Sequence, residues 1–337
     1  MQKAFITGLA GLELSVSERA FLRTERPAGL ILFLRNCATA DQIRQLVADA
    51  LAALGTSDVL VLIDQEGGRV QRLKPPLARL LPPAAAFTAH HADLDAACRS
   101  AALLARLAAD DLTILGINTN CAPVLDVPVP GAHDIIGNRA YGRDPGVIMR
   151  LGRAVAEGLM AGGVLPVIKH IPGHGRALAD SHLELPVVTA TAAELGPSDF
   201  APFAALNTLP AAMTAHVVFA AIDPGQPAST SRRVTEDIIR GHMGFDGLLM
   251  SDDLGMKALS GTFGARTRAV LEAGSDLALH CNGDPGEMRE VAAAAPVLAG
   301  PALQRFERAL AVTRMPRQPY DQATAAATLE RLLATVA

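Results

Sequence analysis

Eight short apolar runs alternate along the chain with longer segments whose apolar residues recur at helical spacing. This alternation is typical of repeated strand and helix units, in which parallel strands form an inner layer that helices cover. No Pro-rich or Ser-rich linker divides the eight units into two halves. The pattern predicts an α/β fold of the (β/α)8 TIM-barrel type, with strands over 3–7, 29–34, 59–63, 118–125, 165–169, 211–215, 247–251 and 276–281.

Helix-start signals support the same division of the chain. Ser15 and Thr39 precede apolar helical stripes, and Glu18 and Gln42 follow them by three residues, as in a capping box. A dinucleotide-binding GxGxxG pattern does not follow the first predicted strand, which argues against an open doubly wound sheet. We expect a single domain over 1–337, in which C-terminal helices over about 284–337 pack on the barrel.

The composition excludes several classes of protein. The 337 residues are 50% apolar and 19% charged with a net charge of −4, whereas a disordered chain is less apolar and a nucleic-acid binder is usually basic. The four cysteines lie far apart, so neither a zinc knuckle nor a disulfide framework is indicated. Charged Glu13 and Glu18 come too early for a signal peptide, and no apolar run reaches membrane-spanning length. We expect a soluble cytoplasmic protein without a membrane or nucleic-acid partner.

Polar or ionisable residues follow the predicted strands. In a (β/α)8 barrel the carboxyl ends of all strands reach one rim, where active sites are built. A single residue of this kind is commonly a loop residue or a helix cap, but the convergence of many at one rim indicates a site. These residues are Arg35, Asp64, Asp126, Lys169, His170, His216, Asp252, Asp253 and His280.

The segment 169–182 holds three histidines, a lysine and an aspartate in a loop that also contains glycine and proline. His170 and His174 have the spacing of a helical zinc motif, and with His182 they form one candidate metal site. The proline and glycine between the first two argue against a helix there. In a second interpretation, the Asp180 carboxylate orients the His182 imidazole, which acts as a general acid and base.

Two adjacent aspartates end the apolar run 247–251. Neighbouring side chains on an extended strand point to opposite faces, so we expect only one carboxylate in the barrel mouth. Asp252 is the candidate nucleophile, because an ionised carboxylate can attack the anomeric carbon of a sugar and stabilise oxocarbenium charge. Asp253 is expected to cap the helix that follows.

Two further loops carry candidate substrate-binding residues. In the segment 61–72, Asp64 can accept hydrogen bonds from two vicinal hydroxyls, and Arg72 offers a planar set of donors. A further loop over 135–142 contributes Arg139. The chain has no tryptophan and only 4% aromatic residues, so a sugar site here should depend on hydrogen bonds rather than on stacking platforms.

At these positions the sequence resembles the short bacterial β-N-acetylglucosaminidases of glycoside hydrolase family 3, which act in peptidoglycan recycling. The resemblance follows the family's order over most of the chain. The combination of KHxPGHG, DSH and SDDL is highly specific. The matching segments are GLILFLRN, DQEGGRVQRL, APVLDV, IIGNRAYGRDP, KHIPGHG with ADSH, and GFDGLLMSDDLGM.

The resemblance implies a role for each matching residue. It implies that Asp252 forms a covalent glycosyl-enzyme, and that His182, paired with Asp180, serves as acid and then as base on a mobile loop. It also implies a monomeric TIM barrel that needs no cofactor or metal. The residues that it implies hold the N-acetylglucosamine unit are Asp64, Arg72, Arg139, Lys169 and His170.

The resemblance thus implies a retaining, exo-acting β-N-acetylglucosaminidase (a β-hexosaminidase) that removes terminal N-acetylglucosamine from small peptidoglycan fragments. Three alternatives stay open. The first is phosphorolysis, in which phosphate in place of water releases the sugar from the glycosyl-enzyme, because a histidine repels phosphate less than a glutamate does. His170, His174 and His182 can hold a metal in a metal-dependent barrel hydrolase. A sugar-binding module without catalysis is the third, and the joint presence of Asp180, His182 and Asp252 argues against it.

Overall fold

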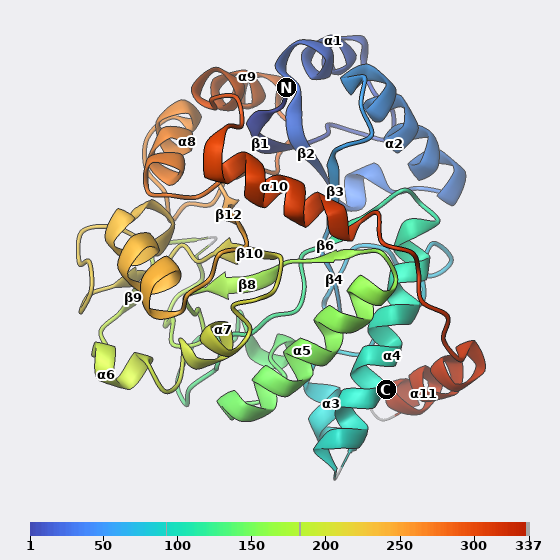
Figure 1. Ribbon diagram of the computed structural model, residues 1–337, viewed down its shortest axis with the longest axis vertical. Helices are drawn as coiled ribbons and strands as arrows, with labels where there is room; N and C mark the ends of the chain where they lie inside the picture. The colour runs from blue at the N-terminus through green and yellow to red at the C-terminus, as the bar shows by residue number, and fades with distance from the viewer. Residues whose placement is uncertain (92, 182, 335–337) are drawn as a thin grey trace.

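The computed structural model describes residues 1–91, 93–181 and 183–334 and has a barrel of parallel strands at its centre (Figure 1). The strands follow one another in the order β7-β6-β3-β2-β1-β13-β12-β10-β8, and every neighbouring pair is parallel. Their bounds are β1 (Lys3–Gly8), β2 (Pro27–Leu32), β3 (Leu60–Ile63), β6 (Thr119–Asn120), β7 (Leu165–Pro166), β8 (Ile168–Ile171), β10 (Ala211–Thr214), β12 (Leu248–Asp253) and β13 (Leu277–His280).

The first and last strands in this order belong to one extended segment. Only Val167 separates β7 from β8, and Val124 forms a parallel bridge to Lys169 beside them. The two ends of the order therefore meet, and eight strand positions close into a barrel. Each predicted run overlaps a strand of this barrel, which confirms the predicted fold class.

One predicted strand is much shorter than expected. The run 118–125 forms regular ladder pairs only at Thr119–Asn120. Pro123 has no N–H group to donate to a ladder, so a proline within this run interrupts regular pairing. The remainder of the run leads directly to Asp126 at the carboxyl end of the barrel.

Helices cover the outside of the barrel. The predicted caps are present: the Ser15 and Thr39 side chains accept hydrogen bonds from the backbone N–H groups of Glu18 and Gln42. The main helices are α1 (Val16–Glu25), α2 (Ala40–Leu54), α3 (Ala85–His90), α4 (Leu94–Thr113), α5 (Pro145–Ala161), α6 (Ala192–Leu195), α7 (Ala201–Ala205), α8 (Phe263–Glu272), α9 (Pro285–Ala294), α10 (Gly300–Val312) and α11 (Gln322–Ala334). A π-helical segment, η4 (Val234–His242), precedes β12.

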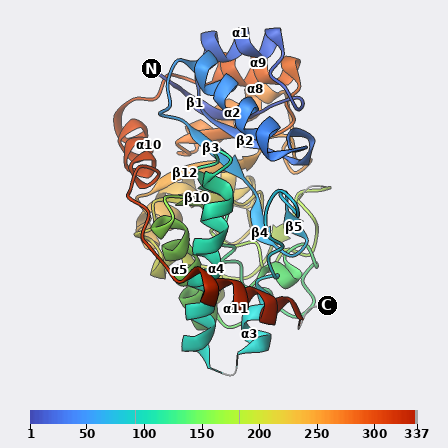
Figure 2. The same ribbon diagram turned by 90° about the vertical axis from the view of Figure 1, so that its right-hand side faces the viewer.

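The barrel interior is a packed apolar core that α10 closes at one end. Ile6, Leu62 and Met250 from the strands belong to the same buried cluster as Phe306 and Leu310 from α10. Figure 1 shows α10 crossing the barrel, and Figure 2 shows the small hairpin of β4 (Gln65–Gly67) and β5 (Val70–Gln71) on the opposite side. Because this hairpin directly follows β3, it marks the carboxyl end of the barrel.

The last helices lie on different parts of the barrel. α9 contacts β1 and β13, α10 contacts β12 and β7, and α11 packs against α3 and α4. The assignment of the whole chain to one domain stays a prediction. Within the described ranges, no helix combines the length and the hydropathy that crossing a membrane requires.

Candidate active site

A cavity of about 510 Å³ opens at the carboxyl end of the barrel. Six of the predicted site residues line it together, although they come from four separate parts of the chain. They are Asp64, Arg72, Arg139, Lys169, His170 and Asp252. The cavity is in the size range of small-molecule sites, and its place agrees with the rim at which barrel enzymes build their active sites.

Five charged side chains form a continuous chain of alternating charge along the cavity wall. Arg72 Nη2 lies 2.9 Å from Asp64 Oδ2, and the other oxygen, Oδ1, lies 2.9 Å from Lys169 Nζ. Lys169 Nζ also lies 2.6 Å from Glu66 Oε1. Glu66 in turn binds Arg139 through two bonds of 2.8 Å, Nε to Oε2 and Nη2 to Oε1. This bidentate geometry holds the guanidinium plane in one orientation.

Burial and charge act in opposite directions on these groups. Burial disfavours the charged carboxylates, but Lys169 and Arg72 hold the pKa of Asp64 well below its usual value. Lys169 and Arg139 likewise lower the pKa of Glu66 despite burial. Burial opposes the Lys169 ammonium, yet Asp64 and Glu66 raise its pKa above the usual value. Asp64, Glu66 and Lys169 are therefore charged near neutral pH, and charged groups form strong hydrogen bonds.

Glu66 is a site residue that the sequence-based reasoning missed. Its side chain is only 7% exposed, and it lines the cavity between Lys169 and Arg139. The signal was its spacing from Asp64, because residues two apart on an extended segment point to the same face. Arg69 was also missed; it lines the cavity and binds Asp134 and the carbonyl groups of Ile135 and Ile136.

Asp126 organises His170, in β8, and His174, in the loop that follows. His170 Nδ1 lies 2.7 Å from Asp126 Oδ2, while Asp126 Oδ1 accepts the backbone N–H groups of His170 at 3.2 Å and His174 at 2.6 Å. These contacts outweigh burial and lower the pKa of Asp126. His174 Nε2 lies 3.0 Å from the Ser181 hydroxyl. Burial and the adjacent His170 lower the pKa of His174 to about 4, so this imidazole is neutral at neutral pH.

The predicted three-histidine metal site can be examined only in part. Its third member, His182, lies outside the described residues. Among those that the structure does describe, no three His, Cys, Asp or Glu side chains are grouped closely enough to hold a metal ion.

The two aspartates at the end of β12 have different surroundings. Both line the cavity, so the expectation that only one would reach it is wrong. Burial disfavours the ionised form of Asp252, but His170 and His216 outweigh it and lower its pKa. Burial instead raises the pKa of Asp253. The ionised form is therefore favoured at Asp252, as a nucleophile requires.

Asp253 does not cap a helix, contrary to the expectation from sequence. Its Oδ1 accepts the backbone N–H groups of Gly255 at 3.0 Å and Cys281 at 3.1 Å. The next helix, α8, begins ten residues later and is capped by Thr262. Asp253 thus ties the turn after β12 to the end of β13, a contact between strands that local sequence does not reveal.

Asp180, one member of the predicted acid/base pair, lies in the loop between β8 and β9 (Val187–Val188). The Asp180 carbonyl accepts the backbone N–H groups of Leu183 and Glu184. Because His182 is outside the described residues, the pairing of Asp180 with His182 stays a prediction. Within the described ranges, Asp180 is not among the residues that line the cavity.

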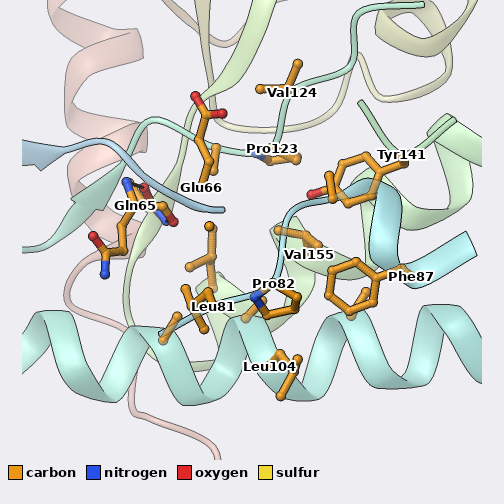
Figure 3. A pocket seen from close by; sticks show the side chains of 18 of the residues that line it. Gln65, Glu66, Leu81, Pro82, Phe87, Leu104, Pro123, Val124, Tyr141 and Val155 are labelled. Carbon is orange, nitrogen blue, oxygen red and sulfur yellow. Dashed lines mark hydrogen bonds between the residues drawn. The ribbon is translucent and has the colours of Figure 1, made fainter. Parts of the chain in front are cut away.

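A second, much smaller cavity lies behind the charged wall (Figure 3). It has a volume of about 40 Å³ and is lined mainly by apolar side chains, among them Phe87, Leu104 and Val155. Glu66 and Arg139 line both cavities. Figure 3 shows the Glu66 carboxylate pointing away from α4, so its charge is directed away from the apolar side chains of this helix.

Comparison with known proteins assigns this barrel and its site to a family. Residues 7–311 match the model of the glycosyl hydrolase family 3 N terminal domain. The chain belongs to glycosyl hydrolase family 3. This match confirms the resemblance inferred from the motifs, and with it the prediction of a glycoside hydrolase.

Members of family 3 from several bacteria are similar to this chain over most of its length. A beta-hexosaminidase from Alkalilimnicola ehrlichii is 40% identical over 279 residues, covering 82% of this chain and 79% of the relative. One from Chromobacterium violaceum is 39% identical over 304 residues, covering 89% and 84%. The solved structure of native NagZ from Neisseria gonorrhoeae matches with a TM-score of 0.88 at 31% identity and covers 98% of both chains.

Proposed function

We propose that this family 3 enzyme is an exo-acting, retaining β-N-acetylglucosaminidase. The observation that carries the proposal is the placement of the Asp252 carboxylate, whose pKa is lowered, in the same cavity as the five-residue charged wall. The relatives named beta-hexosaminidase and the similar NagZ structure support the same substrate class.

The charged wall provides the contacts that a single sugar unit needs. Carboxylate oxygens of Asp64 can accept hydrogen bonds from vicinal hydroxyl groups, and Arg72, Arg139, Lys169 and His170 can donate to sugar oxygens. A neutral sugar has many hydroxyl groups, so a pocket with fixed donors and acceptors recognises it through geometry. In this proposal the terminal N-acetylglucosamine, with its anomeric carbon next to Asp252, is held by Asp64, Arg72, Arg139, Lys169 and His170.

The reaction proceeds by two displacements. In the first, an Asp252 oxygen bonds to the anomeric carbon while the glycosidic C–O bond breaks, and the His182 imidazolium gives its proton to the leaving oxygen. In the second, neutral His182 takes a proton from water as the water oxygen attacks the same carbon and the bond to Asp252 breaks. The Asp180 carboxylate favours the imidazolium form of His182. The product keeps the β configuration.

The proposed physiological substrates are peptidoglycan fragments that end in N-acetylglucosamine, including N-acetylglucosaminyl-anhydro-N-acetylmuramic acid and its peptide derivatives. In this proposal the enzyme acts as a monomer in the cytoplasm during cell-wall recycling. The support comes from the family resemblance and from the similar NagZ structure.

The direct test is the initial rate of 4-nitrophenol release from 4-nitrophenyl β-N-acetylglucosaminide at neutral pH in EDTA. The corresponding β-glucoside is the control for recognition of the acetamido group. We expect release from the first substrate alone, with no increase when phosphate is added. No release from either substrate would reject the proposed activity. Loss of activity in EDTA with recovery in zinc would favour the metal-dependent alternative, and dependence on phosphate would favour phosphorolysis.

A further inference from the structure

The Glu66 carboxylate lies in the site, and both of its oxygens are bound to cations. Its Oε1 lies 2.6 Å from Lys169 Nζ and 2.8 Å from Arg139 Nη2, and its Oε2 lies 2.8 Å from Arg139 Nε. Both oxygens are thus occupied by cations that can themselves contact a ligand. We propose that Glu66 is a positioning residue, which fixes Arg139 and Lys169 as one pair of sugar-binding donors. This inference rests on the proposed function.

Arg139 depends on Glu66 more strongly than Lys169 does. Lys169 keeps a second carboxylate, Asp64, at 2.9 Å. Among the described residues, Arg139 has one further hydrogen bond, from Nη1 to the carbonyl oxygen of Ile135 at 3.1 Å. The bidentate pair with Glu66 therefore defines the plane of the guanidinium group. Loss of the negative charge at Glu66 should release Arg139 first.

The surroundings of Glu66 favour the orientation in which its carboxylate faces Arg139 and Lys169. On its far side lies the small apolar cavity, where Leu104 and Val155 offer no hydrogen-bonding group (Figure 3). The backbone of β4 is held as well, because the Gln65 side chain donates to the Leu73 carbonyl and accepts the Leu73 N–H group. Glu66 thus stands on a fixed strand with its charge directed at the two cations, as positioning requires.

The loop that carries Arg139 has a separate attachment. Arg69 binds the Asp134 carboxylate at 3.0 Å and the carbonyl oxygens of Ile135 and Ile136 at 2.9 and 3.2 Å. These contacts do not involve Glu66. A change at Glu66 should therefore reorient the Arg139 side chain while the loop backbone stays in place.

The test uses Glu66→Gln in the full-length enzyme, since the amide keeps the shape of the side chain and removes its charge. For 4-nitrophenyl β-N-acetylglucosaminide we expect KM to rise about tenfold, with a smaller change in kcat, because a charge-assisted bond to a binding residue is weakened. The inhibition constant for free N-acetylglucosamine should rise in parallel. Glu66→Asp, which keeps the charge on a shorter stem, should recover part of the loss.

A double-mutant cycle separates positioning from a merely structural role. If Glu66 acts through Arg139, then Glu66→Gln should add little to the KM of Arg139→Ala. If the two residues act independently, the fold-increases in KM of the two single variants should multiply in the double variant. Glu25→Gln is the matched control, because Glu25 pairs with Lys3 at 2.7 Å far from the cavity. We expect this control to behave as the parent enzyme does.

Two results would overturn the inference. One is an unchanged KM in Glu66→Gln. The other is a double variant whose fold-increase in KM equals the product of the increases in the two single variants. If Glu66→Gln fails to fold, Glu66→Ala, which also removes the charge, decides by the same KM comparison, and a KM equal to that of the parent overturns the inference. Turnover by the parent enzyme tests the proposed function separately, so the two failures can be told apart.

Discussion

The imidazole Nδ1 of His170 lies 2.7 Å from the buried Asp126 carboxylate. The same carboxylate accepts two backbone N–H groups, one from His170 in β8 and one from His174 in the loop that leaves this strand. Asp126 therefore sets both the direction of the His170 ring and the path of the loop. Because the carboxylate is fully buried, these hydrogen bonds are not exchanged with water.

We expect Asp126→Ala to lower both stability and activity. The substitution leaves three donors without their charged acceptor, which should reduce the free energy of unfolding by about 3 kcal/mol. Urea denaturation measures this loss, and kcat/KM measures the effect of a misplaced His170. Asp237→Ala, which changes an exposed carboxylate of η4, is the control. Equal stability of the two variants would contradict the structural role of Asp126.

Removal of the proposed nucleophile should abolish turnover without unfolding the protein. We expect Asp252→Ala to reduce kcat by about 10⁴-fold or more, the range seen when a catalytic group of this kind is removed. The thermal midpoint should stay close to that of the parent, because the residue lies at the rim rather than in the barrel core. Asp253→Asn is the comparison, since it keeps an oxygen for the Gly255 and Cys281 N–H groups. Substantial turnover by Asp252→Ala would move the nucleophile elsewhere.

The proposed acid/base pair predicts an effect that depends on the leaving group. Asp180→Ala should slow cleavage of N-acetylglucosamine from a sugar aglycone by about 10²-fold or more, because that leaving oxygen needs a proton. The rate of the first step with 4-nitrophenyl β-N-acetylglucosaminide should fall less, because 4-nitrophenolate leaves readily without protonation. The ratio of kcat/KM values for the two substrates checks this. An unchanged ratio with unchanged rates would show that Asp180 does not assist His182.

The buried His174 predicts that acid destabilises the fold before the carboxylates are protonated. Its pKa is lowered from 6.5 to about 4 in the folded protein, because burial and His170 disfavour the cation. The folded chain therefore binds fewer protons than the unfolded chain between these values. The contribution of His174 to the free energy of unfolding is fully present above pH 6.5. It is lost as the pH falls toward 4, which lowers the stability by about 3 kcal/mol from this group alone.

Urea denaturation at pH 7, 5.5 and 4.5 tests the His174 prediction. In His174→Gln this part of the pH dependence should disappear, and the difference between the two proteins should shrink as the pH falls. The comparison cancels the contribution of every other titrating group. Parallel curves for the two proteins would mean that His174 does not titrate in this window.

Local sequence determined the strands, helix starts and rim of this protein. Apolar runs alternating with helical stripes predicted all eight barrel positions, because the periodicity of a strand or helix is a property of neighbouring residues. Ser15 and Thr39 cap their helices for the same local reason. Parallel strands end at one rim, so the polar residues after them could be placed together before any side chain was seen.

The contacts made by these rim residues were decided by tertiary structure. Asp64 and Lys169 are 105 positions apart, and the closure of the barrel brings their charged atoms within 2.9 Å. The same closure turns Glu66 toward two cations and ties Asp253 to β13 instead of to a helix. Such pairings depend on how strands from distant parts of the chain are arranged, which no local pattern of residues specifies. The sequence by itself therefore determined which strands and strand-end residues form the rim. The folded barrel decided which side chains line the cavity and which of them form ion pairs and hydrogen bonds with one another.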